Sequence, residues 1–277
     1  MYSNNSTNKK GNKSTKSIQV QKEKSQQDIV NNNLDLDGIQ GKYYALIIGN
    51  NDYKDSAISS LDEPINDGKK LYDLLISKYT FKKENTVFLK NASYVQMIEA
   101  FDKLSNTITK QDNLLVFYAG HGWWDEKKNL GYWLPTDARK KNTAFWIANS
   151  RISDYMSSIK SKHTLLIADA CFSGSIFKTR SAFKDAGQAI KSLHKLPSRS
   201  AMTSGNLKEV PDKSVFLQYL VKRLKDNDQK FLTADQLFVS FRIAVMNNSS
   251  TEPQFGTIRN AGDEGGEFIF VKKESFK

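Results

Sequence analysis

The chain contains 277 residues, with three histidines, one cysteine and a formal net charge of +11. No apolar run approaches the roughly eighteen residues that a membrane-spanning helix needs, and the basic N-terminus lacks the apolar stretch of a secretory signal. One cysteine excludes an intramolecular disulfide, so we expect a reducing, cytoplasmic setting in which a thiol stays usable.

Residues 1–40 differ from the rest of the chain in composition. They are rich in Asn, Ser, Lys and Gln and contain no aromatic residue after Tyr2. Such a segment cannot bury enough apolar surface to offset the entropy of ordering it. We therefore expect a disordered basic tail over 1–40 and one folded domain over 41–277.

The positive charge favours either a solvated surface of lysines or weak binding to nucleic acid. The sequence shows no RNA-binding aromatic pattern, zinc knuckle or helix-turn-helix signature. We therefore expect no nucleic-acid partner and keep nucleic-acid binding as the weaker alternative.

Four elements are predicted in the first part of the folded domain. They are a buried strand over 43–49, a helix over 62–79, a short strand over 85–90 and a helix over 93–104. Apolar residues recur at helical spacing in both helices. Pro64 suits the first turn of the first helix, and Ser93 can cap the second.

Two further apolar runs predict buried strands over 114–120 and 164–170. A short helix is expected over 152–159. The aromatic residues of 123–124 and 132–135, between the two strands, are expected to lie in a loop.

The last part of the chain begins with a basic region, 177–200, which has little periodicity. Helices are predicted over 215–224 and over 234–245, the second capped by Thr233. A strand over 267–271 closes the domain. Strands that alternate with helices in this way indicate an α/β domain with a mainly parallel sheet.

Two of the predicted strands lead directly into residues that carry chemistry. One runs into His121 and the other into Cys171. Parallel sheets place their sites at the carboxyl ends of their strands, so these residues make a candidate Cys/His pair. Asp169 shares a face of its strand with Cys171, and a carboxylate there needs a partner or a wet pocket. The alternative is that Cys171 is a small buried apolar residue.

The three histidines differ in their surroundings. His121 ends a strand and is followed by Gly122, which suits a general acid and base near neutral pH. The backbone N–H groups of Gly122 and Cys171 are candidate oxyanion donors. His163 starts a strand and is expected to be structural, and His194 is expected to be exposed in the basic region.

Other chemistries are poorly supported by the residue spacing. One cysteine and three dispersed histidines do not form a zinc motif, so we expect no metal and no cofactor. Ser173 lacks the G-x-S-x-G pattern of a serine nucleophile. The glycines of 262–266 predict a turn, because no Lys and hydroxyl follow them as in a phosphate-binding loop.

Four short stretches resemble the motifs of one peptidase family, and their order and spacing agree over about 41–271. They are 44–50 (YALIIGN), Asn66-Asp67, 117–122 (FYAGHG) and 169–174 (DACFSG). The chain resembles the caspase-like cysteine peptidases of clan CD (peptidase C14), and more closely their metacaspase and bacterial caspase-domain branch. The resemblance implies a caspase-like three-layer sandwich, with a mainly parallel sheet of about six strands flanked by helices.

The resemblance also implies roles for individual residues. Cys171 would be the nucleophile, His121 the general acid and base, and Gly122 and Cys171 the oxyanion donors. Asp67 and Asp169 would line the S1 pocket, where two carboxylates select a basic P1 side chain, Arg or Lys. The alternative for Asp67 is a carboxylate that faces the positive end of its helix.

The resulting hypothesis is a cysteine endopeptidase that acts on proteins or peptides with a basic P1 residue. Phe172 and the pair 123–124 depart from the pattern without touching the assigned chemistry. Calcium dependence, known in some relatives, stays open. The basic region 177–200 is either a self-cleavage site, as in relatives, or an ordinary exposed loop. The alternative function is a non-catalytic interaction module that signals through a regulatory protein.

Overall fold

The structure is a computed structural model that describes residues 41–170, 176–178, 194–205 and 213–274, together with Met1. The prediction of a disordered tail over 1–40 therefore stays a prediction. The described elements run in chain order as β1 (Tyr43–Gly49), α2 (Pro64–Lys78), η1 (Lys83–Asn85), β2 (Thr86–Lys90), α3 (Tyr94–Thr107), β3 (Asn113–Ala119), β4 (Gly122–Asp125), β5 (Leu130–Trp133), β6 (Ile147–Ala148), α4 (Asn149–Ser158), β7 (His163–Asp169), β8 (Phe177–Lys178), β9 (Ser198–Thr203), α6 (Val215–Asp226), β10 (Phe231–Thr233), α7 (Ala234–Asn248), β11 (Gln254–Ile258) and β12 (Ile269–Val271).

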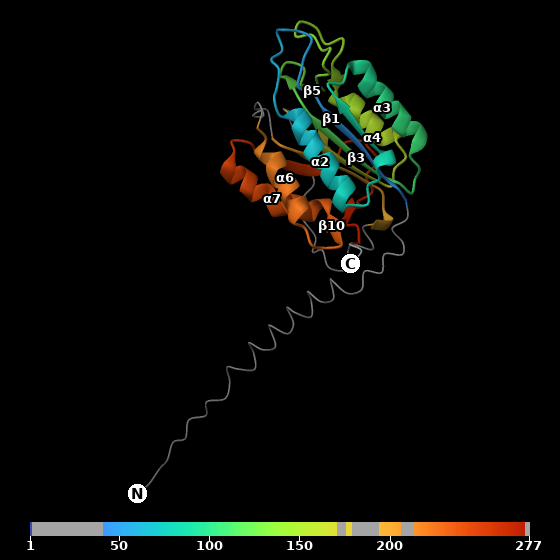
Figure 1. Ribbon diagram of the computed structural model, residues 1–277, viewed down its shortest axis with the longest axis vertical. Helices are drawn as coiled ribbons and strands as arrows, with labels where there is room; N and C mark the ends of the chain where they lie inside the picture. The colour runs from blue at the N-terminus through green and yellow to red at the C-terminus, as the bar shows by residue number, and fades with distance from the viewer. Residues whose placement is uncertain (2–40, 171–175, 179–193, 206–212, 275–277) are drawn as a thin grey trace. The chain divides into compact units, whose positions relative to one another are not determined.

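A seven-stranded sheet forms the centre of the fold (Figure 1). Its strand order is β2-β1-β3-β7-β9-β11-β8. The first five strands are parallel, and β11 and β8 join them in antiparallel pairs. The prediction of an α/β domain with a mainly parallel sheet is confirmed.

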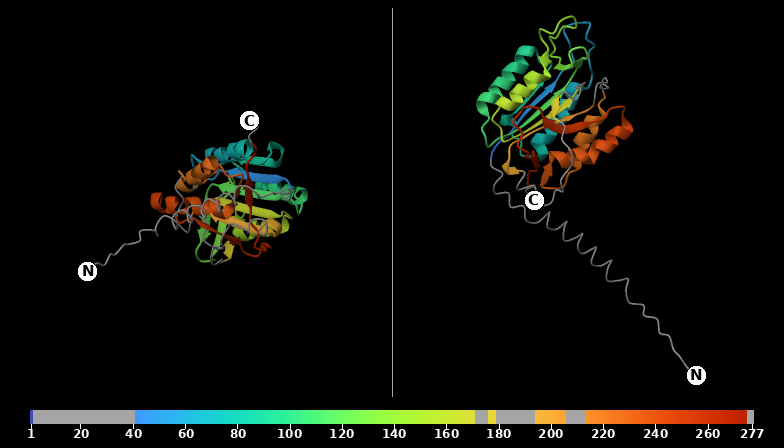
Figure 2. Two further views of the ribbon diagram at one scale, coloured as in Figure 1. Left: turned by 90° about the horizontal axis from the view of Figure 1, so that it is seen from below. Right: turned by 180° about the vertical axis from the view of Figure 1, so that it is seen from behind.

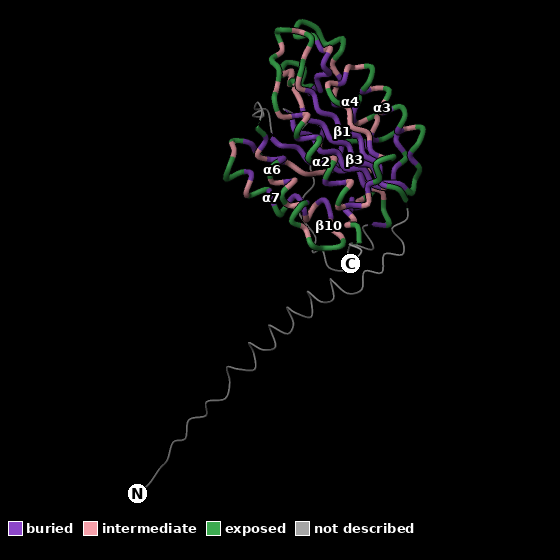
Figure 3. Tube along the Cα trace, viewed as in Figure 1, coloured by how far each residue is buried: buried purple, intermediate pink, exposed green. Residues whose placement is uncertain are grey.

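Helices cover both faces of this sheet (Figure 1, Figure 2). Side chains of α2, α6 and α7 pack with Leu115 and Phe117 of β3 on one face. Side chains of α3 and α4 pack with Leu114 and Val116 of β3 on the other. Successive residues of a strand point to opposite faces, so a strand that is apolar at every position supplies both cores. Every residue of β1, β3 and β7 is buried for this reason (Figure 3).

The three central strands end at the same level. Ala119 at the end of β3 is the register partner of Gly49 in β1 and of Asp169 in β7. Residues that follow these three positions therefore leave the sheet side by side.

Polar side chains set the starts of three helices. Ser93 and Thr233 accept hydrogen bonds from Gln96 N–H and Gln236 N–H in full capping boxes before α3 and α7. Ser214 caps α6 by accepting from Leu217 N–H. The predicted caps of Ser93 and Thr233 are confirmed, as is Pro64 in the first turn of α2.

The prediction that residues 123–124 and 132–135 lie in a loop is wrong for 123–124 and 132–133, which lie in strands. Here β4 and β5 form an antiparallel pair, and β6 adds a third strand. The strands are short, and their aromatic side chains alternate between a buried face and an outer face. Trp133 is fully buried and stacks on Tyr118, with ring centroids 4.3 Å apart. Residues 134 and 135 follow β5, outside any strand.

The basic region 177–200 contains two strand segments that its composition does not reveal. β8 pairs with β11, and β9 occupies a buried place beside β7. Arg199 in β9 is 6% exposed, and its guanidinium donates to backbone carbonyl groups that follow α4, at 2.8 Å for Ser161. These bonds satisfy the buried cation, so a polar segment can lie inside the sheet. The last strand, predicted over 267–271, is shorter in the structure, where β12 begins at Ile269. It pairs with β10 in a separate sheet.

Two histidines pack together at the start of β7. The rings of His163 and His194 lie 4.7 Å apart. His194 is only 4% exposed, so its predicted exposure is wrong, because it covers the His163 ring. The His194 carbonyl oxygen lies 3.2 Å from His163 Nε2 and can only accept, so Nε2 carries the hydrogen and Nδ1 accepts from Ser198, 2.9 Å away.

Burial lowers the pKa of His163 to about 3 and that of His194 to about 4. Between pH 3 and 6.5 the unfolded chain therefore binds a proton at His163 that the folded chain does not, so the free energy of unfolding rises with pH in this window. Going from pH 7 to pH 5 should cost about 2 kcal/mol through His163 alone. In urea titrations at both pH values, His163→Gln should lose part of this pH dependence. An unchanged pH dependence in the variant would contradict the assignment.

Candidate active site

The ends of β3 and β7 bring two predicted site residues to one edge of the sheet. Asp169 is the last residue of β7 and pairs in register with Ala119. His121 comes two residues after Ala119. Cys171 comes two residues after Asp169 in the sequence, and lies outside the described residues.

The backbone of His121 is held from both sides. Its N–H donates to the Tyr53 hydroxyl at 2.8 Å, and its carbonyl oxygen accepts from the Tyr118 hydroxyl at 2.6 Å. The preceding Gly120 has φ +153°, and a Cβ there would lie 3.0 Å from each of these hydroxyl oxygens. Glycine is therefore the residue that lets the chain turn from β3 into His121.

The imidazole of His121 is half-buried and has a defined tautomer. Nε2 lies 2.8 Å from the Ser59 carbonyl oxygen, and the ring packs 5.0 Å from the Tyr53 ring. A carbonyl oxygen can only accept, so Nε2 carries the hydrogen in the neutral ring. Nδ1 then has the free lone pair, which is what a general base needs.

Gly122 opens β4 directly beside this imidazole. It is half-buried and stands opposite Trp133 in register. Leu134 N–H donates to the His121 carbonyl oxygen at 3.0 Å, so the strand pairing extends back to His121 itself. The small sheet is therefore joined to the backbone of His121, which carries the imidazole, by a backbone hydrogen bond.

Asp67 and Asp169 form the second part of the site, and we call this pair the acidic socket. Each is 6% exposed. Asp169 lies on the same strand face as Leu165 and Ile167, toward α2 and α6. Asp67 lies in the first turn of α2, one turn before the buried Leu71.

The two carboxylates influence each other electrostatically. Burial raises the pKa of Asp169 to about 6, and the negative charge of Asp67 acts in the same direction. The hydroxyl groups of Ser214 and Ser204 act in the opposite direction. Asp169 Oδ1 has no hydrogen-bond partner among the described residues, which leaves a buried acceptor atom for a cation. Lys70 Nζ lies 2.8 Å from Asp67 and neutralises part of its charge.

The sequence does not identify three groups of this site. Ser59 contributes a backbone carbonyl, which has no signature in the sequence. Ser204 and Ser214 come from the segments after β9 and before α6, and only the cap position of Ser214 could have been recognised. Asp67 lies in the first turn of α2, which agrees with the alternative prediction of a carboxylate that faces the positive end of its helix. The same position leaves Asp67 in the acidic socket, so the two roles are compatible.

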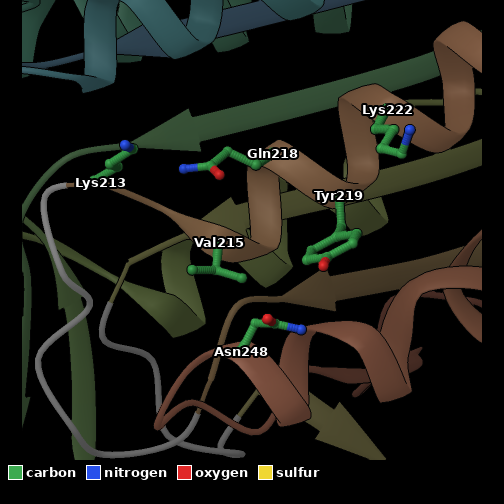
Figure 4. A pocket seen from close by; sticks show the side chains of 6 residues that line it. All are labelled: Lys213, Val215, Gln218, Tyr219, Lys222 and Asn248. Carbon is green, nitrogen blue, oxygen red and sulfur yellow. The ribbon is translucent and has the colours of Figure 1, made fainter.

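A pocket of about 570 Å³ lies between α6 and α7 (Figure 4). It is lined by Lys213, Val215, Gln218, Tyr219, Lys222 and Asn248. None of these six side chains is a carboxylate, imidazole or thiol, so the pocket does not offer the chemistry that the strand ends do. In the described part of the chain, no group of three or more His, Cys, Asp or Glu side chains could hold a metal ion. No helix there is long and apolar enough to cross a membrane.

Comparison with known proteins decides the family. The model of the caspase domain, peptidase family C14, matches residues 42–261. The chain belongs to the caspase-domain family. This family implies a cysteine-type peptidase, with proteins or peptides as substrates.

A solved structure agrees with this caspase domain in fold. It is that of protein GSU0716 from Geobacter sulfurreducens, with a TM-score of 0.54 and 16% sequence identity. The similarity covers 85% of this chain and 98% of that one. No curated protein sequence matches the chain.

The raised pKa of Asp169 predicts a pH effect on the stability of the caspase domain. Between pH 3.8 and about 6, folded Asp169 keeps a proton that the unfolded chain releases, so its contribution to the free energy of unfolding falls as pH rises. The total change is about 3 kcal/mol. Relative to wild type, Asp169→Asn should therefore gain stability between pH 4 and 7 in urea titrations.

The carboxylate of Asp125 in β4 offers a matched control. The Lys128 N–H lowers the pKa of Asp125, so this carboxylate contributes stability that is lost as pH falls. Because this loss lies below pH 3.8, Asp125→Asn should show little change in stability relative to wild type between pH 4 and 7. If Asp169→Asn changed as little as Asp125→Asn over this range, the assigned environment of Asp169 would be wrong.

Proposed function

We propose that this caspase domain is a cysteine endopeptidase that cleaves after Arg or Lys, with Cys171 as nucleophile and His121 as general acid and base. The observation that carries the proposal is the register of β3 and β7. Ala119 and Asp169 are partners, and His121 and Cys171 each follow their strand by two residues. Neighbouring strands lie about 4.8 Å apart, so the ends of β3 and β7 are adjacent, and a meeting of the two side chains beyond these ends is the proposal.

The proposed reaction uses the tautomer of His121. Nδ1 takes the thiol proton of Cys171, and the thiolate attacks the carbonyl carbon of the scissile bond. The N–H groups of Gly122 and Cys171 stabilise the resulting oxyanion. The imidazolium then protonates the leaving amine as the C–N bond breaks, which leaves a thioester. Water, deprotonated by His121, hydrolyses the thioester and restores the thiol.

The acidic socket supports a basic P1 side chain. Asp169 holds a buried carboxylate oxygen without a partner among the described residues, and a guanidinium or ammonium group supplies the donors that such an oxygen needs. The nearby charge of Asp67 adds to the attraction for a cation. An acidic P1 side chain would be repelled by both carboxylates.

The proposal also covers self-cleavage, the cellular compartment and the branch of the family. The basic region 177–200 would be cut by the enzyme itself, as its Lys and Arg residues fit the proposed specificity. Lys178 lies in β8, paired with Thr257 of β11, so cleavage there would require this strand pair to open. We also propose that the protein is a cytoplasmic enzyme of the metacaspase branch and that it acts without a cofactor. Calcium is the ion whose effect on activity is to be tested.

Fluorogenic peptides that end in Arg, Lys or Asp before the dye test the activity and its specificity. Wild type should hydrolyse the Arg and Lys peptides. Cys171→Ala should abolish turnover, and His121→Ala should lower kcat by about 10²- to 10⁴-fold. Absence of turnover of all three peptides, with no labelling of Cys171 by peptidyl ketones, would instead support a non-catalytic interaction module.

The specificity should depend on pH through the acidic socket. Asp169 is ionised above pH 6, so KM for the Arg peptide should rise as pH falls below about 6. Asp169→Asn should raise KM by at least about tenfold and flatten this dependence, since a buried charge-assisted contact is lost. A variant that keeps the wild-type KM profile would exclude Asp169 from the S1 pocket.

Self-cleavage is tested separately by intact-mass spectrometry of wild type beside Cys171→Ala. Fragments that end in Lys or Arg within 177–200 are expected in the wild type alone. Fragments in both samples would show that another protease had cut the chain.

A further inference from the structure

The small sheet β4–β5–β6 presents an aromatic outer face that the proposed chemistry does not use. Trp123 in β4 stands opposite Tyr132 in β5. Trp146, which precedes β6, packs 5.8 Å from the Trp123 ring and 5.4 Å from the Tyr132 ring. We call these three residues the aromatic platform. Trp123 is 44% exposed, which is unusual for so large an apolar side chain.

The platform is held rigidly in place. Trp146 Nε1 donates to the Arg139 carbonyl oxygen at 3.0 Å, so its ring has a fixed orientation. The opposite face of the same sheet carries Trp133, which is buried against Tyr118 and Phe101. Within the aromatic platform Trp123 is exposed and Trp146 is partly buried, whereas Tyr132 is buried and forms the base on which the two Trp rings pack.

The platform continues directly from the imidazole. Strand pairing extends from Trp123 back to His121 through the bond between Leu134 N–H and the His121 carbonyl oxygen. Trp123 follows His121 by two residues, so their Cα atoms lie at most about 7 Å apart. Trp123 therefore lies within the span of about two residues of an extended peptide from His121.

The arrangement decides which side of the scissile bond would meet the platform. The acidic socket lies on the sheet face covered by α2 and α6, whereas Trp133 and Ile147 anchor the small sheet in the core under α3 and α4. With P1 in the socket, His121 must reach the leaving nitrogen in order to protonate it. The peptide after the scissile bond then departs past His121, toward Trp123.

We propose that the aromatic platform binds a bulky apolar side chain of the substrate, Trp, Phe or Leu, within three residues after the scissile bond. This inference rests on the proposed peptidase function. An apolar side chain that covers Trp123 would remove apolar surface of both partners from water, and an apolar contact of this size discriminates by about tenfold. The platform would thus add a second requirement to the basic P1 residue.

Internally quenched peptides test the inference. All share one sequence up to a P1 Arg, and differ by Trp or Ala at each of the three following positions. Wild type should cleave one of the Trp peptides with kcat/KM about tenfold above the Ala peptide. In Trp123→Ala this ratio should fall toward one, and in Trp123→Phe most of it should return.

Val239→Ala serves as the control, because Val239 is an exposed apolar residue on α7, away from β4. This variant should keep the wild-type ratio, and circular dichroism should show that all variants are folded. An unchanged ratio in folded Trp123→Ala would overturn the inference while leaving the peptidase intact. Failure of wild type to cleave any Arg peptide, including one with a dye directly after Arg, would overturn the proposed function and the inference together.

Discussion

The level ends of three parallel strands are the constraint on which the site depends. Because Gly49, Ala119 and Asp169 are register partners, the chain leaves β1, β3 and β7 at one edge. A slip of one residue in β7 would turn Asp169 to the other face of the sheet. It would move the carboxylate away from Asp67 and shift the end of β7 relative to the end of β3. The apolar packing that fixes this register, on both faces of the sheet, thus also positions the strand ends from which the proposed site is built.

Burial of polar groups sets two opposing pH responses in one domain. His163 and His194 stay neutral inside the fold, so acid favours the unfolded chain. Asp169 keeps its proton to a higher pH than an exposed carboxyl group, so acid favours the fold at that point. The histidine pair lies at the start of β7 and Asp169 at its end. The same buried strand therefore carries two opposite titrations, a structural one at its start and, in the proposed peptidase, a functional one at its end.

Sequence patterns predict the elements whose stability comes from continuous apolar surface. The strands β1, β3 and β7 and the helices α2, α3, α6 and α7 were all recognisable in this way. β9 was not, because a buried strand that contains Arg199 is stable only through hydrogen bonds with distant carbonyl groups. Ser59 was not either, since a backbone carbonyl looks the same in every residue. The proximity of Asp67 to Asp169 depends on how α2 packs, and only the family resemblance suggested it.

Tyr118 links the core of the sheet to its reactive edge through one hydroxyl group. That group lies 2.6 Å from the His121 carbonyl oxygen and 3.1 Å from the Leu134 carbonyl oxygen. The two strands of the β4–β5 hairpin are thereby tied to one atom at the base of the hairpin. Loss of this one buried hydroxyl, as in Tyr118→Phe, would therefore loosen the base of the hairpin and the His121 backbone together, although Tyr118 itself belongs to the core.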